Sequence, residues 1–204
     1  LKAVLKKAHE WGYVPYNAAA DVKTEREGKK QPQPYTREEI DRMFAELQPQ
    51  HRQIATIYLH TGLRRGELME LMWSDVDFEA GTITVRKAKN EDDRTVPLSA
   101  EVFQILQEHR QERRARVVDL RVFGETADIR KVLDRAAVRA GFEEGRRHRL
   151  QHRLRDSCAT MLLDAGRQLD EVQEILGHRD IGMTRRYAQT RPERLREAIK
   201  STFG

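Results

Sequence analysis

The sequence predicts a mostly α protein with a small antiparallel β-sheet, an α+β fold. Apolar residues recur at helical spacing along most of the chain, and this pattern changes only between residues 76 and 98. In that region Thr82-Ile83-Thr84-Val85 and Thr95-Val96 are rich in β-branched residues, and the polar run 89–93 separates them. We therefore expect one β-hairpin, alone or with an extra short strand, between two helical regions.

Capping signals and apolar spacing place the individual helices. Thr36 and Glu39 have the spacing of a capping box, which opens a helix. Gly62 ends a second helix, and a third helix begins near Arg64. Helices are also expected after the cap Ser99 and over residues 52–60, 127–140, 153–165, 169–177, 180–188 and 192–202.

The composition divides the chain into four segments. Residues 1–13 have apolar residues at helical spacing, and the stretch from Asp21 to Pro34 is polar and charged, as in a linker. The first residue is Leu1 rather than Met, so we expect the sequence to be a piece of a longer protein. We interpret the segments as the last helix of an upstream domain (1–20), a linker (21–34), the main domain (35–190) and a tail helix (191–204).

The charge balance favours a polyanionic partner. The chain has 38 basic and 33 acidic residues, a net charge of +5, and 28 of the basic residues are arginines. An arginine guanidinium presents a planar fork of donors that matches two phosphate oxygens. Residues 146–155 contain several arginines and no acid. A nucleic acid is therefore the favoured partner, and we expect residues 141–150 to contact backbone phosphates.

Cysteine usage and hydropathy exclude two classes of protein. Cys158 is the only cysteine, so no disulfide framework can form, which fits a reducing, cytoplasmic compartment. No apolar run approaches the length of a membrane span, and the N-terminus lacks a signal-peptide pattern. We expect neither a disulfide-stabilised secreted domain nor a membrane protein, and the spacing of the histidines indicates no metal site.

Three short motifs occur in order, with the predicted hairpin between the first and the second. The first is Thr61-Gly62-Leu63-Arg64-Arg65-Gly66-Glu67-Leu68, and the second is His152-Arg153-Leu154-Arg155. In the third, Leu176-Gly177-His178 precedes Tyr187 by nine residues. Together with the hairpin end Arg94-Thr95-Val96-Pro97-Leu98, these motifs resemble the signature boxes of the tyrosine recombinase (phage integrase) family. The resemblance spans residues 35–190 and implies the catalytic-domain fold of that family.

The resemblance implies a transesterification at a DNA phosphate, and the residue types fit that chemistry. Arg64 and Arg155 would clamp the two non-bridging oxygens and stabilise the charge that builds on the phosphate. Glu67 would orient Arg64 through a salt bridge. Tyr187 would be the nucleophile, and His152, on the same helix face as Arg155, would be the base that takes its proton.

Two further groups complete the implied set. His178 would donate a hydrogen bond to the phosphate, and Lys89, on the turn of the hairpin, would protonate the leaving 5′ oxygen. The hairpin is one residue longer than the common form, so Lys87 competes with Lys89 for this role. After the second motif, members of the family often carry another histidine, where this chain has Asp156.

Each candidate also has an ordinary structural interpretation. Arg64 fits a surface arginine, and His178 fits a helix-end cation that stabilises the helix dipole. Tyr187 fits a core aromatic residue, but Arg185 and Arg186 beside it favour a wet, positive setting that promotes the phenolate. The helical spacing of Cys158 with its apolar neighbours indicates packing rather than reactivity.

The resemblance implies a site-specific recombinase or integrase encoded by a bacterium or phage. It would cleave and religate double-stranded DNA through a 3′-phosphotyrosyl intermediate, without metal, ATP or cofactor. The family works as a homotetramer on two duplexes and passes through a Holliday junction. Residues 1–20 would end a core-binding domain, and the tail helix would dock onto a neighbouring subunit or fold back in cis. An inactive DNA-binding module and a type IB topoisomerase-like enzyme remain as alternatives.

Overall fold

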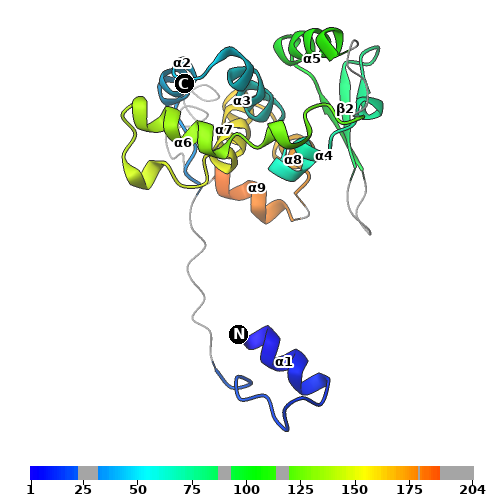
Figure 1. Ribbon diagram of the computed structural model, residues 1–204, viewed down its shortest axis with the longest axis vertical. Coiled ribbons are helices and arrows are strands. Elements are labelled where there is room, and N and C mark those ends of the chain that lie inside the picture. Colours follow the sequence, from blue (N-terminus) through cyan, green and yellow to red (C-terminus); the bar gives the residue numbers. More distant parts are fainter. Residues whose placement is uncertain (23–31, 87–92, 114–119, 179, 189–204) are drawn as a thin grey trace, which may run out of the picture. The chain divides into compact units, whose positions relative to one another are not determined.

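The computed structural model describes residues 1–22, 32–86, 93–113, 120–178 and 180–188 (Figure 1). The chain forms two compact units, Leu1–Gln31 and Pro32–Gly204. In the first unit the only described helix is α1 (Lys2–Glu10), which has no buried residue. Because tertiary packing supplies most of the stability of a short helix, this unit contributes little stability of its own.

The second unit consists of helices and one small sheet, so the α+β prediction is confirmed. None of the helices in the described ranges is long and apolar enough to cross a membrane. The helices are α2 (Arg37–Ala45), α3 (Pro49–Thr61), α4 (Arg65–Glu70), α5 (Ala100–Arg113), α6 (Arg130–Arg139), α7 (Leu150–Asp164), α8 (Leu169–Leu176) and α9 (Ile181–Ala188).

The sheet has three antiparallel strands in the order β1-β2-β3, and they are β1 (Val76–Asp77), β2 (Thr82–Val85) and β3 (Arg94–Pro97). Ile83 pairs with Val76 on one side and with Val96 on the other. The side chains of these three residues are buried, as expected for the inner face of a half-covered sheet. The predicted hairpin and its extra strand are therefore present, while its turn lies outside the described residues.

Helix α7 is the central element of the second unit (Figure 1). It packs against α3, α6, α8 and α9, and most of its residues are buried. Leu154 and Cys158 face the core, and burial raises the pKa of the Cys158 thiol to about 12. Cys158 is therefore a packing residue, as its spacing predicted, and side chains on α7 are held by neighbours on several sides.

Three helix boundaries differ from the sequence prediction. Helix α3 begins at Pro49 instead of Arg52, because proline at the first position loses no hydrogen bond there. Helix α7 begins at Leu150, so His152 lies inside it. Helix α6 begins at Arg130 instead of residue 127. The predicted tail helix 192–202 lies outside the described residues.

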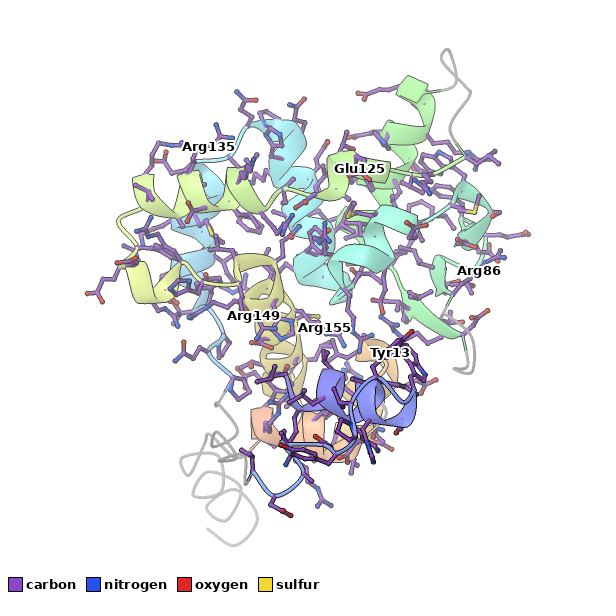
Figure 2. All side chains as sticks on the ribbon, turned by 60° about the horizontal axis from the view of Figure 1, so that its bottom comes forward. Tyr13, Arg86, Glu125, Arg135, Arg149 and Arg155 are labelled. Carbon is purple, nitrogen blue, oxygen red and sulfur yellow. The ribbon has the colours of Figure 1, made fainter. Side chains whose placement is uncertain are left out.

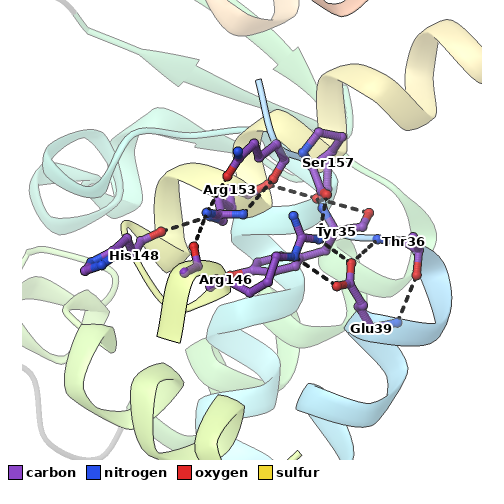
Figure 3. Close-up of polar contacts among 10 residues, drawn as sticks. Tyr35, Thr36, Glu39, Arg146, His148, Arg153 and Ser157 are labelled. Atoms are coloured by element: carbon purple, nitrogen blue, oxygen red, sulfur yellow. Dashed lines mark hydrogen bonds and ion pairs between the residues drawn. The ribbon is translucent and has the colours of Figure 1, made fainter. Parts of the chain in front are cut away.

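A polar cluster fixes the start of the second unit onto α7 (Figure 3). The Tyr35 amide donates to Ser157 Oγ at 2.8 Å, and its hydroxyl donates to the carbonyl of Arg146 at 2.7 Å. The Arg146 guanidinium pairs with Glu39, and Arg153 Nη2 donates to an oxygen of the Gln33 side chain. Arg146 and Arg153 thus make internal contacts, and the expected phosphate contacts along the basic stretch stay a prediction.

We expect Gly62→Ala to destabilise the protein more than Gly81→Ala does. Both glycines have a positive φ, which costs an alanine roughly 1–2 kcal/mol. A Cβ on Gly62 would lie 2.5 Å from Leu176 Cδ2, whereas a Cβ on Gly81 meets no atom within 4 Å. Overpacking adds about 1–3 kcal/mol at Gly62 alone. Urea unfolding of both variants measures the difference, and equal losses would contradict the tight packing around Gly62.

Candidate active site

Arg64 lies at the junction between α3 and α4. Gly62 ends α3 in the left-handed conformation, and Arg64 then forms the N-cap of α4. The Arg64 backbone amide donates to Glu67 Oε2, and its Nη1 donates to Glu67 Oε1, both at 2.7 Å. Its Nη2 donates to the Gly177 carbonyl at 3.3 Å. The side chain is nevertheless 44% exposed, so it can still reach a ligand.

Glu67 is shared between Arg64 and a second arginine, Arg94 of β3. The Arg94 guanidinium donates to both oxygens of Glu67, at 3.0 and 2.7 Å, and its Nε donates to the Ile175 carbonyl at 2.9 Å. Burial alone would raise the pKa of Glu67, but Arg94 and then Arg64 lower it to about 2. The carboxylate therefore stays ionised and positions both arginines, as expected for Arg64.

Arg94 is a site residue that the sequence interpretation missed. It appeared there only as part of the hairpin motif, yet its side chain is almost fully buried. A signal was available, because Arg94 and Val96 occupy the same face of β3 and that face points into the core. A charged residue at such an inward position indicates a buried ion pair.

Arg155 lies on α7 with only 2% of its surface exposed. Its two Nη atoms donate to the carbonyls of Gly62 and Leu176, at the ends of α3 and α8. Burial and then the charge of Arg64 lower the pKa of Arg155 to about 10, so it remains cationic at neutral pH. Two arginines from separate helices thus bring positive charge to one place, which favours an anionic ligand.

An open pocket of about 610 Å³ lies beside this cluster. Figure 2 labels Arg149, which is the N-cap of α7, and Arg155, which lies further along the same helix. Such a cleft, in which six of the twelve lining residues are arginines, can receive a phosphate group. The residues that line it include Arg64, Arg65, Arg130, Arg149, His152 and Arg155.

His152 lies on the wall of this pocket and is exposed to solvent. Partial burial lowers its pKa, Asp156 counteracts this effect, and Arg149 and Arg155 lower the pKa further. The imidazole is therefore mainly neutral near pH 7 and can accept a proton or a hydrogen bond.

His178 follows Gly177 at the end of α8 and is buried. Its Nδ1 lies 2.9 Å from Thr184 Oγ1. Burial, then Arg155 and Arg64, lower the pKa of His178 to about 3. The interpretation of His178 as a helix-end cation is therefore wrong, because burial and the surrounding arginines keep the ring neutral.

Tyr187 lies on α9, and its ring is stacked on that of His178 at 6.3 Å between centroids. Only 4% of its surface is exposed, and its hydroxyl donates to Asp156 Oδ1 at 2.7 Å. Burial and then the charge of Asp156 raise the pKa of Tyr187 above its ordinary value. The expectation that Tyr187 is exposed to solvent is therefore wrong. Helical periodicity places the exposed Arg185 on another face of α9.

The structure brings together five of the six residues that the sequence singled out. Arg64, His152 and Arg155 line the pocket, while His178 and Tyr187 pack against each other on the α8–α9 side. The sixth, Lys89, and its competitor Lys87 lie outside the described residues. In the described part of the chain no group of three His, Cys, Asp or Glu side chains is arranged to hold a metal ion.

The sequence pattern of the phage integrase family matches residues 34–194. Tyrosine recombinase XerA of Thermococcus kodakarensis is 33% identical over 178 residues, which cover 82% of this chain and 61% of that protein. Tyrosine recombinase XerC of Oceanobacillus iheyensis is 30% identical over 206 residues, which cover 92% of this chain and 66% of that protein. The chain thus spans less than two thirds of the length of these relatives.

Solved structures share the fold of the chain. A crystal structure of XerA recombinase matches with a TM-score of 0.71 and 25% identity, over 87% of this chain and 67% of that one. The catalytic domain of bacteriophage HP1 integrase has a TM-score of 0.62 and 32% identity, over 82% and 93%. XerH recombinase bound to a palindromic difH substrate has a TM-score of 0.69 and 26% identity, over 86% and 54%.

We expect Glu67→Gln to reduce the free energy of unfolding by about 3–5 kcal/mol at pH 7, because it leaves Arg94 buried without its carboxylate. Glu70→Gln, on the exposed side of the same helix, should change it by less than about 0.5 kcal/mol. Urea unfolding of the two variants measures both values, and equal losses would contradict the shared-carboxylate arrangement.

The same pair of variants predicts a pH dependence. The pKa of Glu67 is about 2 in the folded protein and about 4.3 when unfolded, so its contribution is complete above pH 4.3. That contribution is lost as the pH falls from about 4.3 to 2. The stability difference between wild type and Glu67→Gln should therefore shrink over this range, and a constant difference would contradict the ionised carboxylate.

Proposed function

Because the chain belongs to the phage integrase family, we propose that it is the catalytic domain of a tyrosine recombinase that cleaves and religates DNA. The cluster formed by Arg155 and by Arg64 with its carboxylate partner Glu67, beside an open cationic pocket, carries this proposal. A dianionic transition state at phosphorus needs such donors, and Arg64 and Arg155 supply them without a metal ion.

The proposed reaction begins with a backbone phosphate in the pocket. Arg64 and Arg155 bind its two non-bridging oxygens, and His152 on the pocket wall contacts the same phosphate or its surrounding water. The neutral His178 ring can donate one hydrogen bond, as its pKa of about 3 leaves it uncharged. These contacts grow stronger as negative charge accumulates, which is the condition for lowering the barrier.

Tyr187 then attacks the phosphorus, and a 3′-phosphotyrosyl ester replaces the broken bond. Lys89 is the proposed acid for the leaving 5′ oxygen, with Lys87 as its competitor. The ester keeps the free energy of the phosphodiester, so a second DNA 5′ hydroxyl can reverse the step without ATP. Recombination results when that hydroxyl belongs to another duplex.

Double-stranded DNA is the proposed partner, and a homotetramer on two duplexes is the proposed assembly. The relatives XerH and Tn1549 integrase have been solved in complexes with DNA, which supports this partner. Residues 1–20 are proposed as the end of a core-binding domain, which fits the absence of buried residues in α1. Residues 191–204 are proposed as the tail that docks on a neighbouring subunit.

Two other functions use the same fold. A DNA-binding module without catalysis would form no covalent adduct, and a type IB topoisomerase-like enzyme would form the adduct but relax one supercoil instead of joining two sites. The pairing of Tyr187 with buried polar groups favours a reactive tyrosine over a decayed site. A two-site recombination assay separates the recombinase from the topoisomerase.

We expect Tyr187→Phe to abolish covalent adduct formation while DNA binding is kept, because only the nucleophilic oxygen is deleted. The assay uses a nicked duplex with the crossover site, from which the cleaved end diffuses away and traps the adduct. Tyr13→Phe, which removes the same atom from an exposed residue, is the matched control and should form the adduct like wild type. An adduct with Tyr187→Phe would contradict the proposed nucleophile.

A further inference from the structure

Asp156 follows Arg155 on α7 but reaches a different neighbour. Successive residues of a helix point about 100° apart, so the two side chains leave α7 on separate faces. Arg155 contacts the ends of α3 and α8, whereas Asp156 contacts α9. Its Oδ1 accepts the hydroxyl proton of Tyr187 at 2.7 Å, and both side chains are less than a tenth exposed.

This pairing fixes the direction of the Tyr187 proton. The phenol is the donor in this hydrogen bond, so its proton points at Asp156 Oδ1. A buried carboxylate is costly unless hydrogen bonds compensate it, which makes the contact a strong orientational constraint.

We propose that Asp156 is the catalytic base of the cleavage step and takes the Tyr187 proton as the phenol oxygen attacks phosphorus. This inference rests on the proposed function. In the step, the O–H bond of Tyr187 breaks and its proton moves to Asp156 Oδ1. The phenol oxygen bonds to phosphorus, the bond from phosphorus to the 5′ oxygen breaks, and a separate acid protonates that oxygen. Religation runs the same transfers in reverse and returns the proton to Tyr187.

The electrostatic surroundings explain why a direct acceptor is needed. Burial and Asp156 raise the pKa of Tyr187, while Arg155 and Arg186 lower it, and the net effect is a rise. The phenol is therefore protonated near pH 7, and it cannot attack as a preformed phenolate. A base in contact with the hydroxyl allows the proton to leave while the new bond forms, when the arginines already carry the growing charge.

His152 was expected for this role from the sequence, but it lies one turn earlier on α7, at the wall of the cationic pocket. Asp156 is the group that the Tyr187 hydroxyl already contacts. The charge of Asp156 raises the pKa of His152 against the lowering effect of burial, so the two side chains are electrostatically connected. In this arrangement Asp156 accepts the Tyr187 proton, and His152 contacts the phosphate.

Asp156→Asn tests the inference, because an amide oxygen can still accept the hydrogen bond but cannot take the proton. Single-turnover adduct formation on the nicked duplex should slow by about 10²–10⁴-fold at pH 7. Asp170→Asn, the same change at an exposed position of α8, is the matched control and should leave the rate unchanged. DNA binding and thermal unfolding of both variants establish that the fold is kept.

Two further readouts distinguish a base from a structural residue. In Asp156→Asn the rate should rise about tenfold per pH unit from pH 7 to 9, because the phenol must then ionise before it attacks, whereas wild type should change little. A duplex with a sulfur in place of the leaving 5′ oxygen needs no acid, so it should restore a Lys89→Ala variant but not Asp156→Asn.

Four results would overturn the inference. Asp156→Asn could cleave like wild type, or it could lose activity with no recovery at high pH, which would make the residue structural. Asp156→Ala could cleave faster than wild type, which would mean that the hydrogen bond from Tyr187 to Asp156 inhibits the nucleophile. A wild-type protein that forms no adduct on any nicked duplex would overturn the proposed function itself, and the inference with it.

Discussion

The buried guanidinium of Arg155 is the contact on which the candidate site depends. It donates hydrogen bonds to the carbonyls of Gly62 and Leu176, which lie at the C-terminal ends of α3 and α8. Carbonyls at a helix end have no partner within the helix and carry partial negative charge, so two helix ends can compensate one buried cation. One side chain from the central helix thereby fixes the segments that carry Arg64 and His178.

The compensation of positive charge around Arg155 is incomplete. Glu67 is a single carboxylate shared by Arg64 and Arg94, and in the described contacts Arg155 donates to backbone carbonyls. Burial, and then the neighbouring positive charges, lower the pKa values of Arg155 and His178. A bound phosphate would compensate this positive charge. The same charges that lower the stability of the free protein therefore favour the binding of an anion.

Much of the fold and of the site could be predicted from local signals. The capping box at Thr36, the αL glycine at Gly62 and the β-branched runs depend on a few neighbouring residues, and each led to the correct element. The three motifs likewise identified Arg64 and Arg155 because their spacing within short segments is diagnostic.

The errors concern contacts between segments that are distant in the sequence. Tyr187 was expected in a wet, positive setting from the arginines beside it, but its environment is set by Asp156, which lies 31 residues earlier. Arg94 was overlooked because its partner Glu67 lies 27 residues earlier in the sequence, on α4. Burial and charge compensation follow from how α7, α9 and β3 pack, and the local sequence does not encode that packing.

The central claim is that the arginine cluster acts on the negative charge of one DNA phosphate. The most direct test compares wild type with Arg64→Ala on three nicked duplexes. One has a normal scissile phosphate, and the other two have the two stereoisomers of a neutral methylphosphonate. Adduct formation by Arg64→Ala should be about 10²–10³-fold slower than wild type on the normal duplex, as for loss of an oxyanion donor. On at least one methylphosphonate isomer the two proteins should differ by only a few fold, because the charge that Arg64 contacts is absent. An equal loss on all three duplexes would contradict the claim and leave Arg64 with a structural role.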